Sequence, residues 1–245
     1  MGLSCSCLKP PIPEEVQKIL NTLEEKVPDI VKKTSKKKDK LDEKKNAILQ
    51  ERDQKVGEAK DKSEDELKNL LKEYNKKELN LEKKAISIEL DKMHSIYEVG
   101  IELADPLKDF TIKQLTKKLE KVPEIGKAAV NSQISELKAF SPKQFLDSKY
   151  GSTLKDALVK QGMNKILLDN FKKELLEDRK KRRKEEREKF SYVKQNEFSP
   201  EDDLEFKTDD LYNSIFDEYK GAFKSHIKKD ILKIEGDEDD DDDDD

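Results

Sequence analysis

Between positions 32 and 84 the sequence runs for 53 residues without a proline and with a single glycine, and 31 of these residues are charged. An acid followed four residues later by a lysine recurs along this stretch, as in Glu51–Lys55 and Glu73–Lys77. Each such pair favours a helix by about 0.2–0.5 kcal/mol. A stretch with so few apolar side chains cannot bury a core of its own. We therefore expect a long, largely solvated helix here.

The whole chain, like this stretch, is rich in charged residues and poor in apolar ones. Charged residues make up 44% of the 245 residues and hydrophobic residues 33%, whereas ordinary soluble domains are about a quarter charged and nearly half apolar. Residues 122–168 are clearly less charged than the chain as a whole, with 11 charged residues among 47. A packed helical part is expected around this segment, and helical or disordered chain elsewhere.

The predicted fold is all-α, with a long charged helix or coiled-coil-like stalk, a small helical bundle, a disordered N-terminus and an acidic C-terminal tail. Pro28 predicts the end of a first helix, and Asp105-Pro106 predicts that a second helix stops and another begins. The expected segments, in chain order, are an acylated N-terminal anchor over 1–12, a short amphipathic helix over 13–31, a long charged helix with a partial heptad seam over 32–104, a small helical bundle over 105–176, a basic helical extension over 177–198, an acidic amphipathic region over 199–235 and a disordered poly-Asp tail over 236–245.

The chain begins with MGLSCSC, which contains both of its cysteines, Cys5 and Cys7. Gly2 and Ser6 fit the pattern M-G-x-x-x-[ST] for N-myristoylation, and a cysteine close to an acylated glycine can carry a palmitoyl thioester. One myristoyl chain binds a bilayer only marginally, so stable anchoring requires a second signal. We predict N-myristoylation of Gly2 and S-palmitoylation of Cys5 and Cys7.

These seven residues resemble the dually acylated N-termini of Src-type kinases and G-protein α subunits, and similar ones in many protozoan membrane proteins. The resemblance implies membrane attachment and nothing about the rest of the chain. Two alternatives are a tail with incidental thiols and a metal site. For a metal site the C-x-C pair lacks further ligands, since His94 and His226 are distant and tetrahedral zinc takes four.

Two basic clusters indicate anionic partners, and a charge asymmetry along the chain indicates interaction surfaces of opposite sign. Residues 1–196 carry a formal charge of +9 and residues 197–245 one of -14. Such clusters are attracted to anionic lipid, and the alternative is a solvated helix face. Nucleic acid is not an expected partner, because acids flank the second cluster and no aromatic residues interleave with it. The first cluster, a candidate lipid-head-group patch, comprises Lys32, Lys33, Lys36, Lys37, Lys38 and Lys40, and the second comprises Arg179, Lys180, Lys181, Arg182, Arg183 and Lys184.

The functional prediction is a non-enzymatic peripheral membrane scaffold or tether, held by its lipid anchor on the inner face of the plasma membrane or another cytoplasm-facing membrane. The alternative is a soluble coiled-coil or acidic-tail protein that binds basic partners in the cytoplasm or nucleus. No catalytic motif, metal site or cofactor is predicted. Protein partners are expected at the helical bundle or the amphipathic helices, and self-association through the 67–103 seam. The predicted partner-binding face lies near the C-terminus and comprises Leu211, Ile215, Phe216, Tyr219, Phe223 and Ile227.

Overall fold

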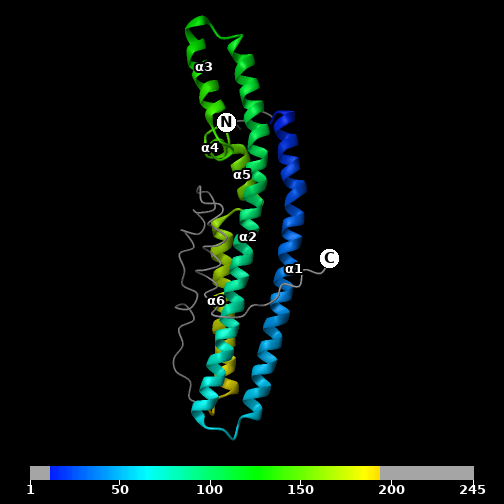
Figure 1. Ribbon diagram of the computed structural model, residues 1–245, viewed down its shortest axis with the longest axis vertical. Helices are drawn as coiled ribbons and strands as arrows, with labels where there is room; N and C mark the ends of the chain where they lie inside the picture. Colours follow the sequence, from blue (N-terminus) through cyan, green and yellow to red (C-terminus); the bar gives the residue numbers. More distant parts are fainter. Residues whose placement is uncertain (1–11, 194–245) are drawn as a thin grey trace, which may run out of the picture. The chain divides into compact units, whose positions relative to one another are not determined.

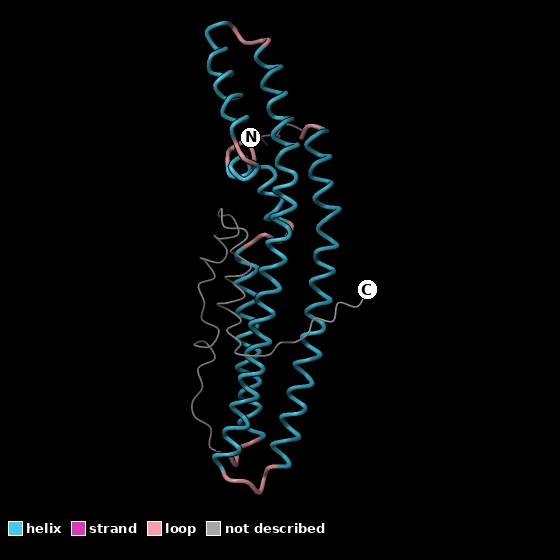
Figure 2. The backbone as a smooth tube through the Cα atoms, in the orientation of Figure 1, coloured by secondary structure: helices cyan, strands magenta, loops and turns pink. Residues whose placement is uncertain are grey.

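The structure, a computed structural model, describes residues 12–193, and in this range it contains helices and loops but no strand (Figures 1 and 2). The predicted all-α fold is confirmed. In chain order the helices are α1 (Glu14–Glu58), α2 (Glu64–Leu119), α3 (Glu124–Ala139), α4 (Pro142–Asp147), α5 (Ser152–Lys160) and α6 (Lys165–Lys189).

The described residues divide into two compact units. The first unit consists of residues 12–30 and 95–163, and the second consists of residues 31–94 and 164–193. The first unit therefore starts earlier along the chain than the predicted bundle over 105–176, and it ends before α6 begins. Helices α3, α4 and α5 all belong to the first unit, whereas α6 belongs to the second.

Helix α1 passes through Pro28, so the prediction that a helix ends there is wrong. Proline in a helix interior removes one backbone hydrogen bond and costs about 3 kcal/mol. Burial on the preceding turn offsets part of this cost, since Leu23 and Val27 are 0% and 3% exposed. The side chain of Pro28 is itself exposed, so its ring does not disturb the packed face.

The long charged helix expected over 32–104 is instead broken between α1 and α2, at residues 59–63. Ser63 and Glu66 form a capping box at the break: the Ser63 hydroxyl accepts from the Glu66 amide at 3.3 Å, and a Glu66 carboxylate oxygen accepts from the Ser63 amide at 3.1 Å. These two bonds satisfy amide groups that a new helix start leaves open, so Ser63 fixes the beginning of α2.

Helix α2 continues through Asp105-Pro106 to Leu119, so the predicted stop and restart there is also wrong. Ala104 and Leu107 are 0% and 4% exposed, while Pro106 faces solvent. The packed face on both sides of the proline keeps the helix continuous. Asp105 does not act as an N-cap but pairs with Lys108 at 2.7 Å.

In the first unit, the short helices α4 and α5 contribute four side chains to the apolar core. Ser141 and Gln144 form a capping box at the start of α4, with bonds of 2.9 and 3.2 Å. Gly100 of α2 lies against Leu158 of α5: a Cβ atom added to Gly100 would sit 2.4 Å from Leu158 Cδ1. The absence of a side chain at Gly100 therefore permits close packing of α2 and α5. The fully buried core side chains here include Leu137, Phe145, Leu146, Leu154 and Leu158.

In the second unit, the apolar seam predicted on α2 packs within the chain. Leu67 and Leu71 join Val56, Phe190 and Val193 in one buried cluster. Further along the same helix Ile86, Leu90 and Met93, which are not among the roughly 3.5-residue-spaced positions of the predicted seam, are buried at 0–2% exposure. The seam positions Leu67 and Leu71 are thus covered by other described residues, and self-association through the seam stays a prediction.

Candidate functional site

The first basic cluster lies on the solvent face of α1. Successive residues of an α-helix are rotated by about 100° around the helix axis. The five exposed lysines of this cluster, together with Lys44 further along α1, therefore lie within about 140° of the helix circumference. Thr34, Arg52 and Val56, which are buried, lie on the opposite side. Within residues 12–193 none of these lysines is ion-paired. We call this set the lysine stripe; it comprises Lys32, Lys33, Lys36, Lys37, Lys40 and Lys44.

Two exposed acids accompany the lysine stripe: Glu43 lies within the same arc of the helix and Asp39 just beyond its edge, whereas Asp42 lies outside the arc. Six lysines against these two acids leave a net charge of +4 on this face. A stripe of unpaired lysines with this excess can attract an anionic surface.

Lys38, predicted as part of the same patch, points away from the lysine stripe. Its ammonium group pairs with Glu89 of α2 and lies 3.9 Å from the ring centroid of Phe171 on α6. Burial raises the pKa of Glu89, but its hydrogen bonds to Lys38 and Lys92 outweigh burial and hold the pKa below its ordinary value. Lys38 thus links three helices of the second unit and is unavailable to an external partner.

The second basic cluster is divided between two environments. Arg179 and Arg183 are 1% and 5% exposed, and Arg182 is half-buried. The lysines of the same run, Lys180, Lys181 and Lys184, are exposed. The sequence predicts one basic patch from these six residues. In the structure they do not form one continuous basic surface.

The buried arginines belong to an ionic network that joins α1, α2 and α6. Arg183 binds Glu78 at 2.9 Å and Glu186 at 2.6 Å, and Glu186 also accepts from Arg52 of α1 at 2.7 Å. Arg182 forms ion pairs with both Glu78 and Glu82. Breaking one pair in such a network leaves an uncompensated buried charge, so the network favours one register of the three helices.

Arg179 and Lys45 complete the network around Glu82. The Arg179 guanidinium lies 3.6 Å from one Glu82 oxygen, and the Lys45 ammonium lies 3.3 Å from the other. We call the set the ionic network; it comprises Lys45, Arg52, Glu78, Glu82, Arg179, Arg182, Arg183 and Glu186.

The two glutamates of α2 in this network have opposite pKa shifts although both are 1% exposed. Burial raises the pKa of Glu78, but the charges of Arg183 and Arg182 outweigh it, so the net pKa is lowered. Burial also raises the pKa of Glu82, and there the neighbouring cations do not compensate for it, so the net pKa is raised. Glu78 is thus the better-compensated carboxylate.

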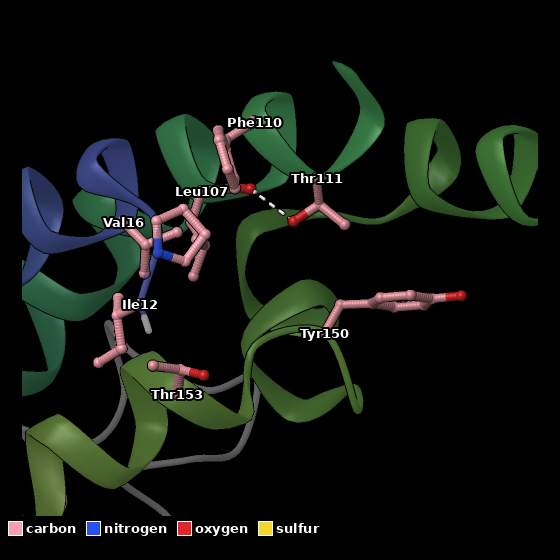
Figure 3. A pocket seen from close by; sticks show the side chains of 8 residues that line it. Ile12, Val16, Leu107, Phe110, Thr111, Tyr150 and Thr153 are labelled. Atoms are coloured by element: carbon pink, nitrogen blue, oxygen red, sulfur yellow. Dashed lines mark hydrogen bonds between the residues drawn. The ribbon is translucent and has the colours of Figure 1, made fainter. Parts of the chain in front are cut away.

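A pocket of about 290 Å³ lies in the first unit, among α1, α2 and α5. Figure 3 shows Ile12, Val16 and Leu107 close together on one side of it, with Thr153 of α5 below them and the ring of Tyr150 pointing away. The full lining comprises Ile12, Pro13, Val16, Leu107, Phe110, Thr111, Tyr150 and Thr153.

Several predicted site residues lie outside the described range of 12–193. They are the lipidation residues Gly2, Cys5 and Cys7, and the partner-binding face Leu211, Ile215, Phe216, Tyr219, Phe223 and Ile227.

Within the described part of the chain, no helix is long and apolar enough to cross a membrane, and no three His, Cys, Asp or Glu side chains are grouped as a metal site. In the comparisons with known proteins, the chain matches no protein-family model, no curated protein and no solved structure.

Proposed function

We propose that the protein is a non-enzymatic peripheral membrane scaffold or tether. Its N-terminus is anchored by myristate on Gly2 and palmitate on Cys5 and Cys7, on a cytoplasm-facing membrane such as the inner face of the plasma membrane. The observation that carries the proposal is the lysine stripe, which is exposed and free of ion pairs within residues 12–193. Anionic lipid attracts each such lysine by up to about 1 kcal/mol near the surface.

The contrast between the two basic clusters supports this function over nucleic-acid binding. Arg179 and Arg183, which could make bidentate contacts to phosphate, bind Glu78, Glu82 and Glu186 instead. The lysine stripe has no such internal partners. Lysine acts as a point charge without the geometric specificity of arginine, which suits a diffuse anionic surface.

The alternative function is a soluble protein that binds basic partners through its acidic C-terminus. It assigns no role to the lysine stripe, whereas the membrane proposal gives the stripe one, the attraction of anionic lipid in addition to the two lipid anchors. Removing charge from the stripe therefore separates the two functions.

The test compares two full-length, acylated variants that lose the same charge. The first carries Lys32→Gln, Lys36→Gln and Lys40→Gln in the lysine stripe. The control carries Lys113→Gln, Lys117→Gln and Lys118→Gln at exposed positions of α2. Binding to vesicles of phosphatidylcholine and phosphatidylserine is measured by sedimentation at low and high salt.

We expect the stripe variant to lose tenfold to a hundredfold in binding at low salt, because up to about 1 kcal/mol is lost with each lysine. The control should change by less than about threefold, and high salt should remove the difference between the two, because it screens exposed charges. Equal losses in both variants, or no loss in the stripe variant, would contradict the assigned role of the stripe.

A further inference from the structure

We propose that the pocket in the first unit binds the chain's own N-terminal fatty-acyl group while Cys5 and Cys7 carry no palmitate. This inference rests on the acylation of Gly2 in the proposed function. It adds a binding site for a saturated hydrocarbon chain and a condition under which that site is filled.

The lining suits a hydrocarbon. Five of its eight residues are apolar, and the hydroxyl of Thr111 already donates a hydrogen bond to the backbone carbonyl of Leu107 at 2.8 Å. Figure 3 shows this bond along α2, next to the apolar group formed by Ile12, Val16 and Leu107. Binding sites for small molecules are mostly apolar with a few polar groups, and the polar groups of this lining are Thr111, Tyr150 and Thr153.

The pocket lies where the N-terminal segment joins the described chain. Ile12 and Pro13 are the first described residues and both line the pocket. Ten residues lead from Gly2 to Ile12, and at full extension they span about 35 Å. The acyl group on Gly2 can therefore return to the pocket without any change in the helices.

The volume of the pocket matches most of a myristoyl chain. An apolar cavity of about 150 Å³ holds benzene, which is roughly 25 Å³ for each carbon atom. At that density the 290 Å³ of this pocket accommodates about a dozen carbon atoms. The side chain of Ile12 is 49% exposed beside it, and an acyl chain in the pocket would cover it.

A filled pocket withholds the first lipid from the membrane. When a binding-competent state is only partly populated, apparent affinity falls in proportion to its population. The unpalmitoylated protein would then exchange freely between membranes, and palmitoylation at Cys5 and Cys7 would retain it at the membrane where that second lipid is added.

The test uses the full chain with Cys5→Ser and Cys7→Ser, acylated at Gly2 as verified by intact mass. Vesicles of pure phosphatidylcholine remove the attraction to the lysine stripe. Thr153→Phe places a ring in the pocket from an exposed position of α5, and Ser152→Phe adds the same ring at the exposed neighbour that does not line the pocket.

We expect Thr153→Phe to raise the partition constant about tenfold, towards the roughly 10⁴ M⁻¹ of a freely exposed myristoyl chain. Ser152→Phe should leave it unchanged, and Thr153→Phe on a Gly2→Ala background should have no effect. An acylated Thr153→Phe chain that partitions like the unsubstituted one would overturn the pocket proposal alone. An intact mass without an acyl group would overturn the proposed function and this inference together.

A second measurement does not depend on a substitution. With a ¹³C-labelled acyl group, nuclear Overhauser effects should connect its terminal methyl to the methyls of Val16 and Leu107. Their absence in the acylated, unpalmitoylated protein would also overturn the inference.

Discussion

The arginines of this chain have a different role from its lysines. Of 51 basic residues only five are arginine, and four of these (Arg52, Arg179, Arg182 and Arg183) belong to the ionic network. The planar guanidinium is weakly hydrated and can bind two carboxylates at once, so arginine suits a buried ion pair better than lysine does. This uneven use of arginine is visible in the sequence and could have indicated buried positions.

The first prediction concerns neighbouring residues of α6. Arg183→Ala should lower the free energy of unfolding by about 3–5 kcal/mol, because it leaves the buried Glu78 and Glu186 without a shared partner. Lys184→Ala, at an exposed position, should change it by less than about 0.5 kcal/mol. Urea denaturation followed by circular dichroism measures both, and equal effects would show that the network contributes nothing specific.

The second prediction uses the opposite pKa shifts of the two glutamates. The pKa of Glu78 is lowered in the folded state. The contribution of Glu78 to the free energy of unfolding is therefore fully present when the pH is above the ordinary glutamate pKa of 4.5, and it is lost as the pH falls below that value. The pKa of Glu82 is raised, so its ionised form reduces stability at neutral pH.

Glu78→Gln should therefore be more destabilising than Glu82→Gln at pH 7, by about 1–3 kcal/mol, and the difference should shrink as the pH falls towards 4. Urea denaturation of both variants at pH 7, 5 and 4 provides the measurement. A larger loss of stability for Glu82→Gln than for Glu78→Gln at pH 7 would show that the neighbouring cations stabilise the charge of Glu82 better than that of Glu78.

At the scale of elements, the helices could be predicted from the sequence but several of their ends could not. Pro28 and Pro106 are standard indications of helix ends, yet burial on the adjacent turns keeps α1 and α2 continuous through both. The true break has its own local signal, the Ser63-x-x-Glu66 capping box, which the charge pattern obscures. Pairs of opposite charge four residues apart indicate that a segment favours a helix. They do not indicate where that helix ends, because its end depends on how far its packed face continues.

The third prediction compares one substitution in two helices. Gly57 of α1 has no atom within 4 Å of the position a Cβ would take, so Gly57→Ala should stabilise the protein by about 0.5–1 kcal/mol. At Gly100 of α2 the new methyl would meet Leu158, so Gly100→Ala should destabilise it by about 1–3 kcal/mol. Thermal denaturation measures both, and the same sign at both sites would contradict the close packing of α2 and α5.

At the scale of the whole molecule, the all-α class follows from the composition, but the grouping of the helices does not. The first unit combines residues 12–30 with 95–163, and no periodicity in either segment indicates its partner. The candidate site was likewise only half predictable. Exposed lysines follow from helical spacing, whereas the inward position of Lys38 depends on Glu89 and Phe171, which are distant in sequence.

The central claim is that the N-terminal lipids hold the whole chain on a membrane. Its most direct test is fractionation of cells that express the full chain with a C-terminal tag, alongside the Gly2→Ala variant and the Cys5→Ser/Cys7→Ser variant. The wild-type chain should sediment with membranes and stay there in high salt, because two lipids anchor it stably. The Gly2→Ala variant should be in the supernatant, and the double cysteine variant should be largely released. A wild-type chain that is already in the supernatant, or a Gly2→Ala variant that stays with the membranes, would contradict the account.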